Sequence, residues 1–160
     1  MINLERIKKS ILKGWTIEKI IENFDWDEFE DMVVEVFVSN DFLVKKNFRF
    51  RTEKRYEMDI IAVRFNKVFC IDCKEWGRGR NKRHGLRSAA RKQIERTEKF
   101  RRFLKNNLKV KKMFNVKLNY RFIPLIVTWL QEDILQENGC LVIPVWILNN
   151  FLLDMDNYVL

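Results

Sequence analysis

The chain has 160 residues, of which 47% are hydrophobic and 33% are charged. This composition is typical of one globular domain with a real core, and it excludes disordered and fibrous chains. No apolar run approaches the roughly 20 residues of a membrane span, and the first 15 residues interleave charges too closely for an export signal. With only three cysteines, we expect a cytoplasmic protein in a reducing compartment, without disulfides.

Positive charge is concentrated in one part of the chain. The net charge is +9, and residues 74–113 hold 16 Lys and Arg against three acids, a local charge of +13 that leaves −4 for the rest. A basic block beside a neutral or acidic body favours a polyanionic partner, and nucleic acid is the one we expect. A solvated basic helix without any partner is the alternative.

The hydrophobic patterns, taken in chain order, predict elements in the order α-β-β-β-α-β-β-α. Residues 1–24 are expected to form a small helical extension, with short amphipathic helices at 2–13 and 16–23. Longer helices are expected from the Asp25 cap to about Val38 and over 86–105, a short helix around 148–155, and a basic loop over 77–85. Strands are expected at 42–50, 56–64, 67–74, 119–130 and 140–147. Residues 1–160 are therefore predicted to form a single α/β domain with a mixed central sheet flanked by helices.

Charged residues interrupt two of the apolar strands, in the sequence MDIIAVRFNKVFCIDCKEW at residues 58–76. Side chains two residues apart share a face of a strand, so Asp72 and Lys74 point the same way and Asp59 shares its face with Glu57. If these strands pair as a hairpin, the two aspartates and the lysine converge at one end of the sheet. Neighbouring carboxylates repel each other unless a cation lies between them, and oxygen ligands of this kind suit Mg²⁺, with Mn²⁺ as a substitute.

Two helices carry a polar residue on the face that should be apolar. Glu30 lies between Phe37 and Val34 on a helical wheel, where it either reaches solvent at the edge of the apolar arc or points at the metal of the sheet. Gln93 lies in the middle of the apolar face of the helix at 86–105. A buried glutamine needs hydrogen-bond partners, and either the backbone or a group near a bound phosphate could supply them.

These residues together resemble the PD-(D/E)xK nuclease superfamily. Asp59 followed by Asp72-Cys73-Lys74 is similar to its D…(D/E)xK signature, and the strings EMDIIA and VFCIDCKEW resemble the two strands that carry it. Glu30 before the Asp41-Phe42 turn resembles the helical glutamate of archaeal Holliday-junction resolvases, and Gln93 resembles the helical glutamine of the Mrr-like and RecB-like branches. The resemblance covers about residues 26–104. Three departures leave the branch open: Met58 replaces a common proline, Asp41 replaces a glycine, and no tyrosine follows Gln93 in its motif.

The resemblance implies a restriction-endonuclease-like fold and a catalytic set of Glu30, Asp59, Asp72, Lys74 and Gln93. Asp59, Asp72 and the backbone carbonyl of Cys73 are expected to hold Mg²⁺, and Glu30 to complete the shell directly or through water. Lys74 is expected to orient or help to deprotonate the attacking water. The implied reaction is endonucleolytic cleavage of DNA that leaves a 5′-phosphate. It remains open whether Glu57 replaces or assists Glu30.

Basic residues of the loop at 77–85 and of the following helix are expected to bind the DNA backbone. They are Arg78, Arg80, Lys82, Arg83, Arg87, Arg91, Lys92 and Arg96. Holliday-junction cleavage, which requires a homodimer, and restriction- or repair-type cleavage both fit the motif. The first 40 residues hold nine acids against five bases and are a candidate surface for a protein partner. The alternative to an enzyme is a DNA-binding module that retains the nuclease fold without catalysis.

Cys70 and Cys73 form a C-x-x-C pair, which elsewhere indicates zinc or redox chemistry. On a strand, residues three apart face opposite ways, and the sequence has no second cysteine pair. His84 is the only histidine and follows basic residues in a loop. We therefore expect neither structural zinc nor thiol chemistry, and we expect His84 to contact phosphate or solvent.

Overall fold

The computed structural model describes residues 9–16, 19–20, 23, 25–74, 82–117, 119–129 and 135–158, except for the side chains of residues 82, 83 and 158. Within the predicted N-terminal extension, residues 9–12 and 19–20 are helical. The predicted phosphate contacts Arg78 and Arg80 lie outside the described residues, as do the side chains of Lys82 and Arg83. None of the helices within the described ranges combines the length and apolar character that crossing a membrane requires.

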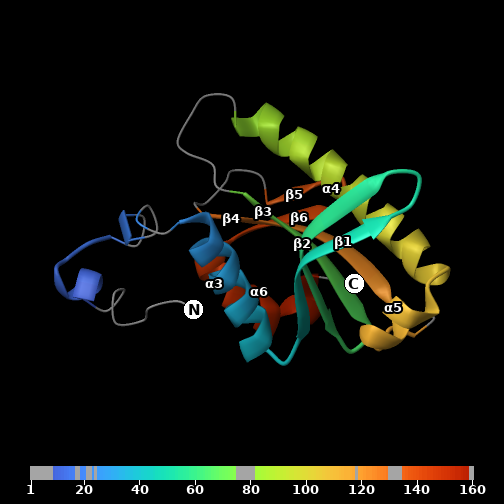
Figure 1. Cartoon of the computed structure of the whole chain (residues 1–160). Coiled ribbons are helices and arrows are strands. Elements are labelled where there is room, and N and C mark those ends of the chain that lie inside the picture. Colours follow the sequence, from blue (N-terminus) through green and yellow to red (C-terminus); the bar gives the residue numbers. More distant parts are fainter. Residues whose placement is uncertain are drawn as a thin grey trace.

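A six-stranded mixed sheet forms the centre of the molecule (Figure 1). Its strands are β1 (Leu43–Arg51), β2 (Arg55–Arg64), β3 (Lys67–Lys74), β4 (Arg121–Thr128), β5 (Gln136–Glu137) and β6 (Cys140–Pro144). They lie in the order β1-β2-β3-β4-β6-β5. The β1–β2, β2–β3 and β5–β6 pairs are antiparallel, whereas β3–β4 and β4–β6 are parallel. The mixed sheet flanked by helices confirms the predicted fold class.

Helices cover both faces of the sheet and bury an apolar cluster on each. The helices are α3 (Trp26–Ser39), α4 (Lys82–Lys105), α5 (Leu108–Met113), α6 (Val145–Leu153) and α7 (Met155–Tyr158). On one face, α3 and α6 enclose a core that contains Phe29, Phe37, Phe69 and Leu148. On the other face, α4 and the turn after α5 bury Phe50, Phe100 and Phe114 against the first three strands. The functional residues described below lie between these two layers.

Three predicted element bounds were wrong, and three elements were not predicted. The strand predicted at 140–147 ends at Pro144, and α6 begins at Val145 rather than near 148. The buried residues Val145, Leu148, Phe151 and Leu152 follow the helical period, and Pro144 in extended conformation starts the helix. Residues 82–85 of the predicted loop already belong to α4. The sequence patterns also gave no sign of α5, of the two-residue strand β5 or of a separate α7.

The β1–β2 hairpin bends in the middle, and this bend places a site residue. Val44 and Lys46 of β1 face the α3 side, whereas Phe48 and Phe50 face α4. Asn47 between them has a positive φ of 52°, a left-handed conformation that asparagine tolerates better than most residues. Because alternation along the strand changes at this position, the outer half of the hairpin turns toward α4. Asp59 lies on β2 at the same level, where the register pairs with β1 are interrupted.

Candidate active site

Asp72 and Lys74 lie at the carboxyl end of β3, with their side chains on the α4 side of the sheet, as alternation predicts. Asp72 is 3% exposed, and cations hold both of its oxygens. Lys74 Nζ lies 2.9 Å from one oxygen, and Arg96 Nη1 from α4 lies 2.9 Å from the other. A buried carboxylate is costly unless it is paired, and Asp72 has a cation at each of its two oxygens.

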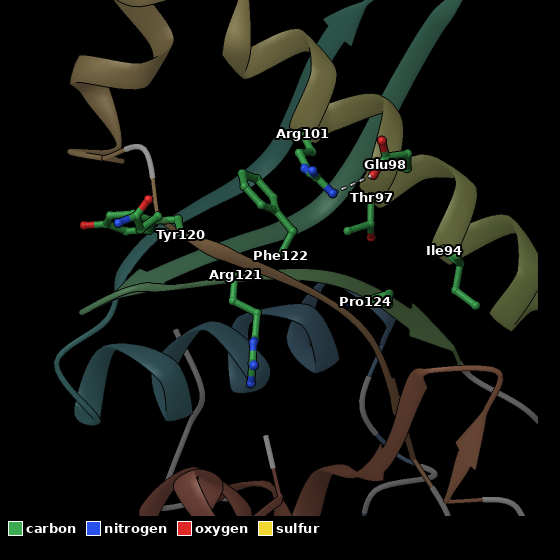
Figure 2. A pocket seen from close by; sticks show the side chains of 9 residues that line it. Ile94, Thr97, Glu98, Arg101, Tyr120, Arg121, Phe122 and Pro124 are labelled. Atoms are coloured by element: carbon green, nitrogen blue, oxygen red, sulfur yellow. Dashed lines mark hydrogen bonds and ion pairs between the residues drawn. The ribbon is translucent and has the colours of Figure 1, made fainter. Parts of the chain in front are cut away.

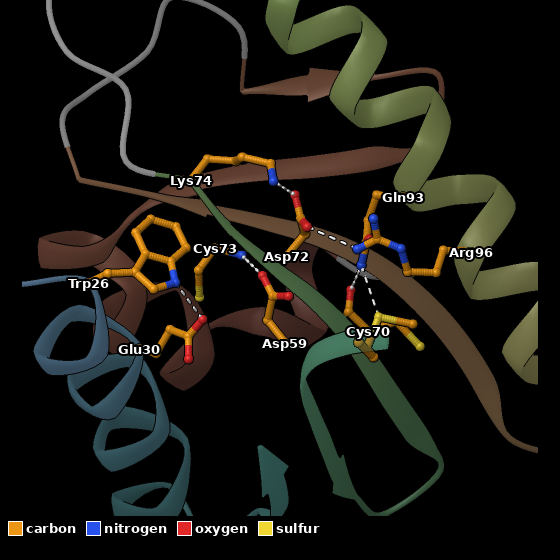
Figure 3. A network of polar contacts seen from close by, with 10 residues as sticks. Trp26, Glu30, Asp59, Cys70, Asp72, Cys73, Lys74, Gln93 and Arg96 are labelled. Carbon is orange, nitrogen blue, oxygen red and sulfur yellow. Dashed lines mark hydrogen bonds and ion pairs between the residues drawn. The ribbon is translucent and has the colours of Figure 1, made fainter. Parts of the chain in front are cut away.

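Asp59 lies beside Asp72 because β2 separates from β3 at this point. The register pairs of the two strands end at Ile60–Ile71, which leaves the backbone N–H groups further along β3 without strand partners from β2. The Asp59 carboxylate accepts a hydrogen bond from the Cys73 N–H at 2.8 Å and thereby satisfies one of them. Figure 3 shows the Asp59 side chain between β2 and the last residues of β3.

The electrostatic surroundings of Asp59 disfavour its charge. Burial first, and then the negative charge of Asp72, raise the pKa of Asp59 from its ordinary value of 3.8 to about 6. The negative charge of Glu30 raises the pKa further, whereas the Cys73 hydrogen bond and Lys74 lower it. No described Lys or Arg side chain lies within ion-pair distance of Asp59. Asp59 is therefore a largely buried carboxylate without a cationic partner among the described residues, and a bound cation would relieve this cost.

Glu30 is buried on α3, as its position on the apolar arc predicted. It is 5% exposed, its Oε1 accepts from the Trp26 indole N–H at 2.9 Å, and its Oε2 lies 3.2 Å from Lys46 Nζ. The same lysine also pairs with Asp31 at 3.0 Å. Glu30 thus approaches the end of β3 from the α3 side, opposite to the α4 side from which Asp72 is held (Figure 3).

Gln93 is fully buried, and its amide connects α4 to β3. Its Nε2 donates to the Cys70 carbonyl at 2.7 Å, and its Oε1 accepts from Arg96 Nη1 at 3.2 Å. The Met58 sulfur lies 3.4 Å from the same Nε2. These contacts identify the partners that a buried glutamine requires, and they orient Arg96 toward Asp72.

An open cleft of about 580 Å³ gives access to these residues. Asp59, Asp72 and Lys74 form part of its lining, together with residues 54–57 of the β1–β2 hairpin and Lys92, Glu95 and Arg96 of α4. Glu57 is exposed at this cleft and forms an ion pair with Arg49 at 2.7 Å. The cleft therefore opens the carboxylates to solvent, and several basic side chains line it.

A second groove lies on the far side of α4, and it lacks this chemistry. Figure 2 shows it between α4 and the start of β4, where Thr97, Arg101, Tyr120 and Phe122 line it. Its one acidic residue, Glu98, forms an ion pair with Arg101 at 3.4 Å. The cleft with two aspartates and a lysine is the better candidate for an active site.

Few side chains at this site could coordinate a metal ion. Across the described ranges, no group of three or more His, Cys, Asp and Glu side chains could hold a metal ion. The donors that converge at the end of β3 are two carboxylates, and the Cys73 carbonyl belongs to the same segment. Carboxylate and carbonyl oxygens are the ligands that hard divalent cations prefer, so the donor chemistry fits Mg²⁺ or Mn²⁺.

The predicted DNA-binding residues of α4 differ in position. Arg87, Arg91 and Lys92 are exposed, and Arg87 lies 3.7 Å from Glu137. Arg96 was predicted on the outer surface, but it is half-buried and bound to Asp72. The helical period contains a signal for this, since Arg96 follows Gln93 by three residues and shares its side of the helix. Lys46, the partner of Glu30, also escaped prediction, although alternation along β1 places it on the same face as Val44.

Cys70 and Cys73 face opposite sides of the sheet, as the strand period predicted. Cys70 lies in the core under α4 and Cys73 in the core under α3. Burial raises the pKa of the Cys70 thiol to about 12, and burial together with nearby carboxylates raises that of Cys73 well above its ordinary value. Neither thiol is a nucleophile at neutral pH, because only the thiolate is reactive. His84 is exposed on the first turn of α4.

The mixed sheet, with two aspartates and a lysine at the ends of neighbouring strands, places this protein in the class of nuclease-like folds. The sequence profile of the nuclease-related domain (NERD) matches residues 25–129, which include all five predicted catalytic residues. The chain therefore belongs to the nuclease-related domain family. This confirms the resemblance to PD-(D/E)xK-type nucleases and supports a nuclease function, but it does not distinguish the resolvase-like, Mrr-like and RecB-like branches.

The chain is also similar to individual proteins. A protein of Archaeoglobus fulgidus, described as uncharacterized, is 30% identical over 135 residues, which cover 84% of this chain and 94% of the relative. The crystal structure of a protein of unknown function, AF1548, has 18% identity and a TM-score of 0.46 over 82% of this chain and 68% of the other. That of VC1899 from Vibrio cholerae has 16% identity and a TM-score of 0.35 over 88% and 32%. These two structural similarities are too low to define a shared function.

Proposed function

We propose that the protein is a divalent-cation-dependent endonuclease that hydrolyses phosphodiester bonds of DNA in the cleft at the end of β3. The observation that carries this proposal is the convergence of Asp59 and Asp72 beside Lys74. The two aspartates repel each other in a partly buried place where the cations of the described residues pair only with Asp72. Electrostatic repulsion between buried carboxylates is typical of functional sites. The oxygen donors present here fit the binding of a divalent cation.

Asp59, Asp72 and the carbonyl of Cys73 are the groups that would hold Mg²⁺, or Mn²⁺ in its place. When bound, the cation would polarise the scissile phosphate and stabilise the negative charge that develops in the transition state. The charge of Glu30 already acts on Asp59, and its proposed contribution is to complete the shell of the cation directly or through water.

Three further side chains would prepare the cleft for hydrolysis. Lys74 lies at the cleft within 2.9 Å of Asp72, where its ammonium group would orient the attacking water and offset charge on the phosphate. Arg96 holds the second oxygen of Asp72, and Gln93 holds Arg96. The exposed cations Arg87, Arg91 and Lys92 would bind backbone phosphates beside the cleft. The expected products carry a 5′-phosphate and a 3′-hydroxyl.

A cleavage assay with matched binding measurements tests the proposal. Asp59→Ala, Asp72→Ala and Lys74→Ala are each expected to abolish cleavage in Mg²⁺ and to retain most of the DNA affinity, and EDTA is expected to abolish wild-type cleavage. Full activity in any of the three variants would contradict the assignment. Wild-type protein that binds DNA but does not cleave it in Mg²⁺ or Mn²⁺ would instead indicate a binding module.

The substrate requires its own comparison. A panel of four-way junction, duplex, nicked, flap and single-stranded DNA separates junction cleavage from restriction- or repair-type cleavage. Junction cleavage requires two active sites, so light scattering would then have to show a homodimer. A mixture with candidate partner proteins tests whether the acidic N-terminal 40 residues act as a docking surface.

A further inference from the structure

The wall of the cleft opposite α4 is the outer half of the β1–β2 hairpin, which the sequence did not single out. In the register of the hairpin, Arg51 is directly opposite Arg55, and Arg49 is directly opposite Glu57. These four side chains therefore share one face of the hairpin, and all four residues are exposed. Three of the four are arginines.

This arrangement does not stabilise the hairpin. Arg49 has an acidic partner, with its Nε 2.7 Å from Glu57, but within the described part of the chain no acidic side chain lies at ion-pair distance from Arg51 or Arg55. Like charges directly opposite each other on neighbouring strands are destabilising. The Arg51–Arg55 pair therefore favours an anionic partner from outside the chain.

The basic face continues directly from the candidate active site. Arg55, Tyr56 and Glu57 line the cleft that holds Asp59 and Asp72, and they also line a neighbouring groove of about 640 Å³. Arg49 and Arg51 line this neighbouring groove but not the cleft. Arg55 precedes Asp59 by four residues, about 13 Å along a strand, so an anion at Arg55 would lie close to the reacting centre without occupying it. The two grooves together form one path along the hairpin.

Contacts on the opposite face of the hairpin fix its position. Phe50 stacks on Tyr56 with ring centroids 5.3 Å apart, and Phe50 also packs on Phe100 and Phe103 of α4 at 5.3 and 5.4 Å. At the tip, Glu53 pairs with Lys99 of α4 and accepts a hydrogen bond from the Tyr56 hydroxyl. The arginine face is thus presented by a fixed element rather than by a free loop, which lowers the entropic cost of binding.

We propose that the β1–β2 hairpin is a second arm for the nucleic-acid backbone, in which Arg51 and Arg55 bind phosphates a few nucleotides from the scissile one. The exposed cations of α4 form the first arm, and the substrate contacts both arms across the cleft that Arg55 and Lys92 line. Because guanidinium groups on phosphates position a strand without reading bases, the binding is independent of sequence. This inference rests on the proposed function of the cleft as a nucleic-acid site.

The test compares two double variants that remove the same charge. Arg51→Gln/Arg55→Gln removes the hairpin pair, and the control Lys117→Gln/Arg121→Gln removes two exposed cations at the other end of the sheet. Arg121 pairs with Lys67 at the start of β3, about 23 Å along the strand from the level of Lys74. Binding of a labelled duplex and of a labelled single strand of the same sequence is measured in EDTA over a range of salt concentrations.

We expect the hairpin variant to bind about five- to tenfold more weakly than wild type at low salt. The slope of log affinity against log salt should become shallower by about 1.8 for duplex and about 1.4 for single strand, as the loss of two phosphate contacts requires. The control should keep the wild-type slope. Arg51→Lys/Arg55→Lys, which keeps both charges, should retain most of the affinity.

Equal affinities and slopes for the hairpin variant and the control would overturn the proposal, and so would selective binding of polyglutamate in place of nucleic acid. Thermal unfolding tests whether the variant is folded. Because the substitution removes a repulsive pair, its melting temperature should be unchanged or higher. If the double variant melts lower, Arg55→Gln alone must still reduce the slope by about half as much.

The readout is independent of catalysis. A wild-type protein that fails to cleave DNA contradicts the proposed enzyme, whereas only the binding series decides the hairpin.

Discussion

Replacing Asp59 by asparagine is expected to stabilise the protein without bound metal. The amide oxygen of the new side chain keeps an acceptor for the Cys73 N–H, so the substitution chiefly removes a negative charge from a place that disfavours it. Raising the pKa of Asp59 from 3.8 to about 6 corresponds to about 3 kcal/mol of preference for the protonated form. This figure is the upper limit of the gain in unfolding free energy at pH 8, and we expect about 1–3 kcal/mol.

The sign of the pH dependence follows from the direction of the shift. Between the two pKa values the folded wild type binds this proton more tightly than the unfolded chain does, so the contribution of Asp59 to stability is fully present below about pH 4 and is lost as the pH rises through about 6. The asparagine variant has no such titration. The difference in unfolding free energy between Asp59→Asn and wild type should therefore be near zero at pH 4 and grow to its full value above pH 7.

Urea unfolding of both proteins in EDTA, repeated across this pH range, measures the difference directly. Other titrating groups cancel because both proteins contain them. Glu35→Gln, at an exposed carboxylate on α3, is the matched control and should stay within about 0.5 kcal/mol of wild type at every pH. A variant that is less stable than wild type at pH 8, or a difference that does not change with pH, would refute the argument that Asp59 is held against its electrostatic preference.

Three further predictions concern the groups around Asp59. Glu30→Gln removes a charge that raises the pKa of Asp59, so NMR titration of the Asp59 carboxyl should give a lower pKa; an unchanged value would contradict the electrostatic link between α3 and the site. Gln93→Ala leaves the buried Cys70 carbonyl without its side-chain donor and should lower the unfolding free energy by about 1–3 kcal/mol, which denaturation in EDTA checks. Mn²⁺ should raise the melting temperature of wild type but not of Asp72→Asn, and an equal increase in both would place the cation elsewhere.

Periodicity predicted the central part of the site because each of its residues violates a regular pattern. Asp59, Asp72 and Lys74 occupy strand positions that alternation assigns to the sheet interior, and Glu30 and Gln93 occupy helical positions that the period of 3.6 assigns to the core. The first three strands and the two long helices were recognised because their apolar periods are long enough to be clear despite these exceptions.

The remaining features depend on contacts between elements that lie far apart in the sequence. Arg96 was placed on an outer surface because the helical wheel does not show that α4 crosses above the end of β3. The bend at Asn47 changes which face of β1 points inward, and alternation alone cannot locate such a change. The basic face of the hairpin required the register of Arg51 with Arg55, which strand prediction does not supply.

The most direct test of the central claim is the rate of DNA cleavage in Mg²⁺ by wild type and by Asp72→Asn, with binding measured in parallel. Asparagine is close to aspartate in shape but cannot carry the negative charge that holds a cation beside Asp59. The account predicts wild-type cleavage that EDTA abolishes, and an Asp72→Asn protein that binds DNA with nearly wild-type affinity and does not cleave it. Cleavage by Asp72→Asn at the wild-type rate, or a wild type that is inert on every DNA substrate in both Mg²⁺ and Mn²⁺, would contradict it.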